Sequence, residues 1–438
     1  MSDNQFIVIG GGLAGVEASY QLAKRGIDVK LYEMRPKKMT EAHTTEYLSE
    51  LVCSNSLGSD DISSASGLLK EELRLLDSFV LKIAEKTRVP AGRSFSVDRI
   101  QMAENITKEL ENIKNIEVIR KEVREIKDLS QPIIIATGPL TSMEFSKFLT
   151  NITLRKNLFF FDATSPIINA DSIDFDKVFF ASRYGKGDDD FVNIPLSEEE
   201  YKEFVSELVN AERVELKDFE RGKLFEDCLP VEEIASRGEM TLAYGPLKPV
   251  GLIDPRTGEQ PFAVVQLRQD DLNKKFYQMV GFQTRLKWGE QKRIFRMLKG
   301  LENAVFERYG RMHRNTYINA PLIINEFYQT KTNKNIFFAG QICGVEGYVE
   351  SIASGLISGI YMHKYLTNQN LKPLPLTSAT GSLVNYITHS DWKNFRPTKF
   401  SFGLLPDLEE RIRKKKDRKI RKSQRAINDL KEWLKANI

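Results

Sequence analysis

Cysteine and histidine are scarce in this 438-residue sequence, which has three cysteines, four histidines and three tryptophans. Three cysteines, an odd number placed far apart, do not make a disulfide framework and lack zinc-site spacing, so we expect no metal. Apolar runs of the roughly 18–20 residues that span a bilayer are also missing. The first apolar run, Phe6–Ile9, starts too early to follow a signal peptide. These absences predict a cytoplasmic protein with reduced thiols and no membrane contact.

Charge is nearly balanced in total but unevenly distributed. The chain has 64 Lys and Arg against 60 Asp and Glu, a net charge of +4, yet residues 411–425 hold ten Lys and Arg against one Asp. That segment carries +9, which leaves −5 for the rest of the chain. Because Lys and Arg neutralise phosphates, the segment is a candidate RNA contact. We expect Arg411, Lys415, Arg418 and Lys422 to share one helical face. We also expect removal of residues 408–438 to weaken RNA binding and leave a bound cofactor in place.

A glycine-rich turn follows the first apolar run. Residues 10–15 (GGGLAG) fit the pattern G-x-G-x-x-G, with a strand before them, a helix after them and Glu33 at the end of the next strand. In this pattern Gly10 allows the tight turn, Gly12 lets the backbone approach a pyrophosphate, and Gly15 allows close packing. The helix start favours phosphate charge, and Glu33 can accept hydrogen bonds from ribose hydroxyls. The sequence therefore predicts a dinucleotide site.

Two later strand ends favour FAD over NAD. Residues 133–135 run into an Ala-Thr-Gly ending, and residues 336–338 run into Ala-Gly and then a helix. Both endings are typical of two-dinucleotide-binding flavoproteins and suggest that the chain returns to complete one FAD site. We therefore predict an α/β fold with a Rossmann-like FAD-binding domain of that type. Its parts are residues 1–158 and 331–405, with an inserted α+β domain at 159–330 and a basic helical tail at 406–438.

Two of the cysteines have polar surroundings. Cys53 lies in a loop-like segment rich in Ser and Asn, and Cys228 stands just before Pro230 and an acidic helix start. Cys343 directly follows a strand, so we expect it to pack in the core. None has a CxxC partner, which argues against disulfide exchange. The alternative for each cysteine is that it packs in the protein interior as a small hydrophobic side chain.

Several longer segments resemble one known family over nearly the whole chain. They are VIGGGLAG at 8–15, LYEMRP at 31–36, ELVCSNSL at 50–57, VPAG at 89–92, VDR at 97–99, MHRNT at 312–316 and GVEGYVES at 344–351. The sequence is similar to the folate- and FAD-dependent RNA uracil-5-methyltransferases. The resemblance implies that methylenetetrahydrofolate supplies a one-carbon unit through reduced FAD to carbon 5 of a uridine. It also implies that NAD(P)H supplies the electrons.

The resemblance also implies residue roles. The two cysteines of the family fall on Cys53 and Cys228; one is expected to add to carbon 6 of uracil and the other to help remove the proton from carbon 5. Carbon 5 is a poor nucleophile until a thiolate adds at carbon 6. Which cysteine has which role stays open. The residues assigned to the cofactor are Gly10, Gly11, Gly12, Leu13, Ala14, Gly15, Glu33, Arg35, Gly138, Gly340, Glu346 and Gly347.

The sequence leaves alternatives open for the RNA substrate and for the class of protein. The T-loop uridine of tRNA is the expected target, and a uridine of 23S ribosomal RNA is the alternative; no protein partner is expected. An NAD(P)H-dependent flavoprotein oxidoreductase without RNA would leave the basic tail unexplained. A sister class that modifies the wobble uridine is longer and needs a partner GTPase, and a fourth alternative is an FAD-containing RNA-binding module without activity. His313, in the basic cluster at 311–314, is either a flavin or substrate contact or structural.

Overall fold

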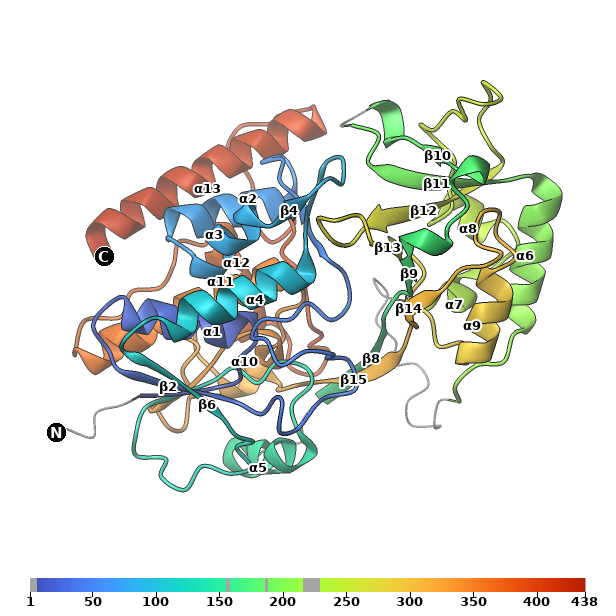
Figure 1. Cartoon of the computed structure of the whole chain (residues 1–438). Helices are drawn as coiled ribbons and strands as arrows, with labels where there is room; N and C mark the ends of the chain where they lie inside the picture. The colour runs from blue at the N-terminus through green and yellow to red at the C-terminus, as the bar shows by residue number, and fades with distance from the viewer. Residues whose placement is uncertain (1–5, 155–157, 186–187, 216–228, 438) are drawn as a thin grey trace.

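The computed structural model describes residues 6–154, 158–185, 188–215 and 229–437 (Figure 1). The strands are β1 Phe6–Ile9, β2 Val29–Glu33, β3 Ser56–Ser59, β4 Arg88–Val89, β5 Ser94–Val97, β6 Ile116–Arg120, β7 Ile133–Ile135, β8 Leu158–Ala163, β9 Ile167–Asn169, β10 Phe179–Phe180, β11 Phe191–Leu196, β12 Ala263–Gln269, β13 Phe276–Met279, β14 Phe306–Arg308, β15 Met312–Tyr317 and β16 Ile336–Phe338. The α-helices are α1 Leu13–Ala23, α2 Ala65–Leu75, α3 Phe79–Lys86, α4 Arg99–Glu111, α5 Met143–Thr153, α6 Glu198–Asn210, α7 Val231–Ala235, α8 Thr241–Tyr244, α9 Trp288–Phe295, α10 Ala320–Ile323, α11 Tyr348–Leu366, α12 Ala379–His389 and α13 Lys415–Asn437.

A five-stranded parallel sheet carries the N-terminal part of the chain, in the order β16-β7-β1-β2-β6. Strand β7 is buried along its whole length, as expected for a parallel strand covered on both faces. Strand β16 pairs with it in the register Ile336 to Ile133, although the whole inserted segment separates the two in sequence. The pairing confirms the predicted α/β, Rossmann-like fold and the return of the chain to the same sheet.

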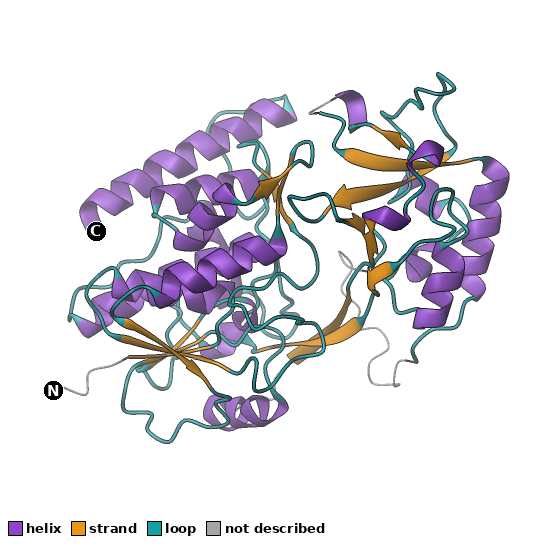
Figure 2. Ribbon diagram, viewed as in Figure 1, coloured by secondary structure: helices purple, strands orange, loops and turns teal. Residues whose placement is uncertain are grey.

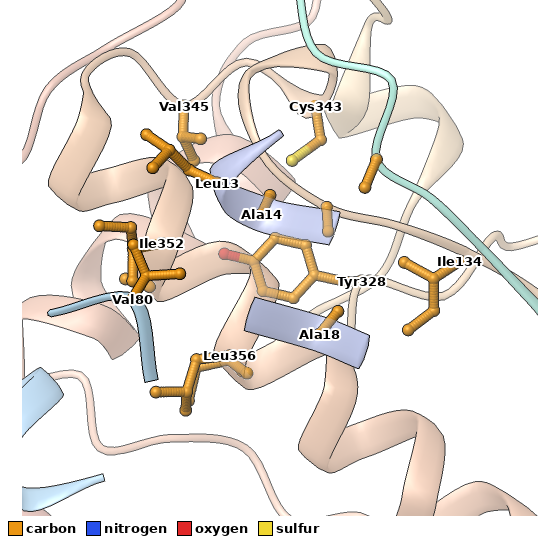
Figure 3. Packing of buried hydrophobic residues seen from close by; sticks show 14 of the residues in the cluster. Leu13, Ala14, Ala18, Val80, Ile134, Tyr328, Cys343, Val345, Ile352 and Leu356 are labelled. Atoms are coloured by element: carbon orange, nitrogen blue, oxygen red, sulfur yellow. The ribbon is translucent and has the colours of Figure 1, made fainter. Parts of the chain in front are cut away.

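Helices α1 and α11 pack closely against one face of this sheet. Figure 3 shows Ala14 and Ala18 of α1 among Ile352 and Leu356 of α11. A Cβ atom on Gly355 of α11 would lie only 2.2 Å from the carbonyl oxygen of Ala14, so glycine there permits the close approach. The contact fixes the starts of both helices near the same sheet edge.

The basic tail is an integral part of this first core. Helix α13 packs along α2 (Figure 1), and its residues Ala426, Leu430 and Trp433 are buried in the first core. The Trp433 indole donates to the carbonyl oxygen of Pro373 at 2.8 Å. Removing residues 408–438 would therefore uncover apolar core, so charge substitutions are the sounder way to test an RNA contact.

A second sheet forms a separate core on the other side of the molecule. Its six strands run in the order β10-β11-β12-β13-β9-β14, with helices α6, α7 and α9 against it (Figure 2). The antiparallel ribbon of β8 and β15 lies between the two parts. Residues 317–328, placed in the inserted domain from sequence, contribute to the first core instead. The remaining domain limits stay a prediction.

No helix among the described residues is long and apolar enough to cross a membrane. The expected cytoplasmic location stays a prediction.

Candidate functional site

The glycine-rich turn has the geometry that the sequence predicts. Gly10 has φ +108°, and a Cβ atom there would lie 2.4 Å from the carbonyl oxygen of Ala136. A Cβ atom on Gly15 would lie 1.8 Å from the carbonyl oxygen of Gly10, so both positions require glycine. Gly12 is different, because a Cβ atom there would meet nothing within 4 Å. The open space beside Gly12 lets a ligand approach the backbone.

Glu33 is held at the end of β2 by two neighbours. One carboxylate oxygen accepts from the Gly11 amide at 2.9 Å, and the other accepts from the backbone amide and the Nε of Arg35. Burial raises the pKa of Glu33, but the Arg35 guanidinium and these amide donors outweigh it and bring the pKa below its ordinary value. Arg35 is itself buried and also pairs with Glu50 at 3.2 Å. Glu33 is therefore a fixed, ionised acceptor beside the glycine turn.

A cavity brings most of the predicted cofactor residues together. They are Gly10, Gly11, Gly12, Leu13, Ala14, Glu33, Arg35, Gly138 and Gly340. Gly15, Glu346 and Gly347 do not line it. Gly15 packs under the turn, and the Glu346 carboxylate accepts from the side chain of Gln341 at 2.6 Å. Burial, together with the charge of Asp162, raises the pKa of Glu346 to about 8.

Two helices begin at this cavity without a side-chain cap. Gly12 precedes α1 and Gly347 precedes α11, and a glycine at each of these cap positions provides no capping side chain. Leu13 and Tyr348, the first residues of the two helices, both line the cavity. Uncapped helix starts present amide donors and a positive end of the dipole to anions. The open Gly12 side, the two helix starts and ionised Glu33 fit a dinucleotide, with its pyrophosphate and ribose.

Cys53 lies where the cavity meets the inserted part of the chain. Its amide donates to the hydroxyl of Tyr348 at 2.9 Å, and its carbonyl oxygen accepts from Nε2 of Gln278 at 2.7 Å. Its thiol is half-buried and lies 3.8 Å from the carbonyl oxygen of Ala163 on the ribbon. Burial and the neighbouring Cys53 raise the pKa of Tyr348 well above its ordinary value, which keeps the hydroxyl neutral. Cys53 is thus held from α11, β8 and β13 together.

A buried cationic cluster supports the residues around Cys53. Arg268 of β12 donates to the Ser54 hydroxyl at 2.7 Å and to Oε1 of Gln278 at 2.6 Å. Arg99 of α4 donates to the carbonyl oxygen of Leu51 and pairs with Asp270 at 2.5 Å. These contacts tie the Cys53 segment to the inserted sheet.

The ribbon carries polar groups that the sequence left undecided. His313 is buried opposite Asp162 on β8, with 4.0 Å between Nε2 and a carboxylate oxygen. Burial lowers the pKa of His313, so the ring is neutral at pH 7. Nδ1 of His313 and both side-chain polar atoms of Asn315 have no hydrogen-bond partner among the described residues. Neither residue lines the dinucleotide cavity.

The other two cysteines differ from Cys53. Cys228 lies outside the described residues, and its predicted role stays a prediction. Cys343 is fully buried, and its thiol contacts the carbonyl oxygen of Gly340 at 2.9 Å. Burial raises its pKa to about 12, which suits the packing role that the sequence predicts. Within the described ranges, no cluster of His, Cys, Asp and Glu is arranged to hold a metal ion.

The four predicted RNA-binding residues do not share one exposed face. Helix α13 begins at Lys415, so Arg411 lies before it, and Lys422 is buried. The ammonium group of Lys422 donates to the carbonyl oxygen of Leu405 at 3.0 Å and to Asp407 at 3.1 Å. Tertiary packing of the apolar side of α13 draws Lys422 inward. Arg411, Lys415 and Arg418 remain exposed.

The exposed start of α13 lies on the side of the first core that faces the inserted part. The charges of Lys416 and Arg93 both act on Asp61. The amide of Gly92, next to Arg93, donates to Asp190 of the inserted part at 2.6 Å. These contacts place the exposed start of α13 near the boundary between the first core and the inserted part.

Sequence reasoning missed Tyr348, Gln278 and Arg268. Tyr348 stands within the GVEGYVES segment, which gave a usable signal. Gln278 and Arg268 lie in ordinary strand-like sequence, more than 200 positions from Cys53 and Ser54. Only the folded arrangement brings them to Cys53.

Comparison with known proteins places the chain among close relatives. Residues 5–370 match the family model described as "Glucose inhibited division protein A". The chain is 52% identical over 433 residues to "Methylenetetrahydrofolate--tRNA-(uracil-5-)-methyltransferase TrmFO" of Fusobacterium nucleatum, covering 99% of both chains. It is 52% identical over 427 residues to the protein of that name from Acetivibrio thermocellus, covering 98% of both. GidA of Aquifex aeolicus in its form II crystal has a TM-score of 0.70 at 17% identity, over 98% of this chain and 72% of that one, a likeness of fold alone.

Proposed function

The chain belongs to the GidA family and within it to the TrmFO proteins, and from that membership we propose that it forms 5-methyluridine in tRNA. Methylenetetrahydrofolate is the carbon donor, as the names of the relatives state for those proteins. One observation of this chain carries the proposal. Cys53, a thiol suited to attack a pyrimidine ring, lies beside a cavity built for a dinucleotide, between Tyr348 and Gln278.

The dinucleotide that fits the cavity is FAD. When bound, FAD supplies the transfer of the one-carbon unit and its reduction, with NAD(P)H as the source of electrons. The amides at the starts of α1 and α11 would hold the negative charge of the pyrophosphate, and Glu33 would accept hydrogen bonds from a ribose. Arg35 keeps Glu33 ionised and oriented, since it donates to the same carboxylate.

The two thiols act on the uracil ring. One thiolate adds to carbon 6, which makes carbon 5 nucleophilic toward the one-carbon unit, and the other helps take the proton from carbon 5. The adding thiolate then leaves carbon 6, which restores the ring double bond. The neutral hydroxyl of Tyr348 and the amide of Gln278 fix the backbone of Cys53 from both sides, so its thiol has a defined position. Cys228 is the second thiol of the proposal.

The RNA is positioned by Lys and Arg side chains at the start of α13. Exposed Arg411, Lys415 and Arg418 neutralise phosphates, while Lys422 serves the packing of the helix instead. The relatives act on tRNA according to their names, which favours tRNA over 23S ribosomal RNA.

The test is methylation of purified RNAs side by side. The purified protein is supplied with methylenetetrahydrofolate labelled in its methylene carbon, with either NADH or NADPH, and with unmodified tRNA or 23S ribosomal RNA. We expect label in tRNA at one T-loop uridine, lost in the Cys53→Ala and Cys228→Ala variants. Label in ribosomal RNA alone would overturn the proposed substrate, and methylation at the wild-type rate by both variants would overturn the thiol mechanism.

A further inference from the structure

Arg268 is a buried cation whose charge no carboxylate of the described residues matches directly. It lies on β12 with a side chain that is almost entirely enclosed. Asp270 is the carboxylate whose negative charge acts most on Arg268, but Asp270 pairs with Arg99 at 2.5 Å. Its Nε atom is buried and has no hydrogen-bond partner in the described part of the chain. A buried guanidinium in this state is costly unless an anion joins it.

Two short hydrogen-bonded routes lead from Arg268 to Cys53. The guanidinium donates to the hydroxyl of Ser54, the residue directly after Cys53, at 2.7 Å. It also donates to Gln278, whose amide in turn donates to the carbonyl oxygen of Cys53 at 2.7 Å. The cation is therefore fixed close to the peptide that carries the thiol.

Three other charged or titratable groups belong to the same cluster. They come from α4, α11 and β14 and are Arg99, Tyr348 and Arg308. The charge of Arg99 is matched by Asp270, and Tyr348 is neutral because burial raises its pKa. Arg308 donates to the carbonyl oxygen of Ala42, whereas Arg268 is hydrogen-bonded to the segment that carries Cys53.

We propose that Arg268 stabilises the thiolate form of Cys53 and is thus a positioning and electrostatic residue for the proposed reaction. The proton of the thiol passes to solvent, and the positive charge of the nearby guanidinium stabilises the negative charge that remains on sulfur. This inference rests on the proposed function for its purpose, but the charge pair can be measured without RNA or folate. A thiolate is the reactive form of cysteine, so the pair keeps Cys53 ready to attack.

The experiment measures alkylation of Cys53 against pH in the purified, FAD-loaded full chain. Iodoacetamide is the probe, and mass spectrometry of the peptide that contains Cys53 gives the rate between pH 5 and pH 9. In Arg268→Met and Arg268→Gln we expect the midpoint of the rate profile to rise by about 1 pH unit or more, because an adjacent cation favours the charged form of a thiol. Arg268→Lys should recover most of the difference, because it keeps the positive charge.

Two controls separate charge from structure. Arg183→Met removes a partly buried arginine that donates to Gln266, also on β12, and Ser54→Ala removes the hydrogen bond but leaves Arg268 charged. We expect Arg183→Met to leave the midpoint unchanged and Ser54→Ala, which loses one of the two links, to shift it less than Arg268→Gln does. An unchanged midpoint in Arg268→Gln, or an equal shift in Ser54→Ala, overturns the proposal. Since alkylation requires no RNA, such a result leaves the methyltransferase proposal standing, and failure of tRNA methylation leaves this one standing.

Discussion

The side-chain amide of Gln278 donates a hydrogen bond to the carbonyl oxygen of Cys53 at 2.7 Å, across 225 positions of sequence. Gln278 belongs to the sheet of the inserted part, whereas Cys53 belongs to the segment beside the dinucleotide cavity. The bond therefore connects the two parts of the molecule at the thiol. It also explains how an inserted sheet can affect chemistry at a cavity that it does not line.

Gln278→Met should lower tRNA methylation while leaving FAD bound. Methionine fills a similar volume but cannot donate to Cys53 or accept from Arg268, so the Cys53 peptide loses one of its anchors. The loss of a hydrogen bond to a charged group corresponds to about 1.5–3 kcal/mol, roughly a 10- to 100-fold fall in rate. Initial rates at saturating tRNA, with flavin absorbance as the check on folding, measure it. Gln101→Met, at an exposed position of α4, is the matched control and should keep the wild-type rate.

Glu33→Gln should weaken FAD binding. The substitution keeps an acceptor for the Gly11 amide but removes the charge that pairs with Arg35. We expect the affinity of the cofactor-free protein for FAD to fall roughly 10- to 100-fold, since charged hydrogen bonds contribute about 1.5–3 kcal/mol. Quenching of flavin fluorescence on titration gives the dissociation constant. Glu46→Gln, in an exposed position of the neighbouring loop, should bind FAD as the wild type does; equal affinity in Glu33→Gln would remove Glu33 from the site.

The sequence predicted the parts of the fold that short-range patterns encode. The run of Phe6–Ile9, the glycines after it and Glu33 at the next strand end follow local rules for a strand, a turn and a helix start, and all three stand where expected. Ile133–Ile135 reads as a buried strand because both of its faces are covered. The return of the chain to the sheet at β16 was predictable because β16, like β7, is a short apolar run that ends in Ala and Gly.

Long-range packing set the features that the sequence did not predict. Lys422 lies in the same basic run as Lys415, but the apolar positions Ala426 and Leu430 turn its side of α13 inward. Arg268 sits in a strand whose neighbours are all buried, and nothing local distinguishes it. Its partners, Ser54 and Gln278, come from two different elements. Such sites depend on which elements meet, and that information is spread over the whole chain.

Gly355→Ala should destabilise the protein. Its Cβ atom would lie 2.2 Å from the Ala14 carbonyl oxygen, and α1 and α11 must separate to admit it. Overpacking of this kind costs about 1–3 kcal/mol, and we expect a lower thermal midpoint and weaker FAD binding, because α1 begins at the cavity. Gly289→Ala, at an exposed position of α9, is the control: a Cβ atom there meets nothing within 4 Å, so its midpoint should be unchanged or slightly higher. Equal midpoints for the two variants would contradict the tight contact.

Glu72 should make the stability of the protein depend on pH. It is fully buried and accepts from the amides of Ala379 and Thr380 at the start of α12. Burial raises its pKa from 4.5 to about 7, although these hydrogen bonds act in the opposite direction and lower it. Between pH 4.5 and about 7, Glu72 therefore stays protonated in the folded chain but is ionised in the unfolded chain. Stability from this group is fully present below about pH 4.5 and is lost as the pH rises toward 7.

The measurement is urea unfolding of the wild type and Glu72→Gln at pH 5 and pH 8. The glutamine variant does not titrate, so the stability advantage of the wild type over it should shrink by about 2–3 kcal/mol as the pH rises. Other buried acids, such as Glu346 and Glu350, are present in both proteins and cancel. Glu109→Gln, at an exposed position, is the control. An advantage that is the same at both pH values would show that Glu72 is ionised throughout.

Reversing two exposed charges at the start of α13 should weaken RNA binding without harming the fold. Lys415→Glu with Arg418→Glu changes side chains that do not contribute to the core, whereas Ala426 and Trp433 keep the helix in place. The matched control is Lys431→Glu with Lys435→Glu, which makes the same charge change at the exposed far end of the same helix.

Equilibrium binding of unmodified tRNA is measured between 50 and 200 mM salt. Each lost phosphate contact should lower the slope of log affinity against log salt by about 0.7–0.9, so the first variant should lose roughly one to two units of slope. The control should lose little, because its charges lie at the end of α13 that is far from the inserted part (Figure 1). If both variants lose the same affinity, the basic tail acts only through net charge, and the start of α13 is not the RNA contact.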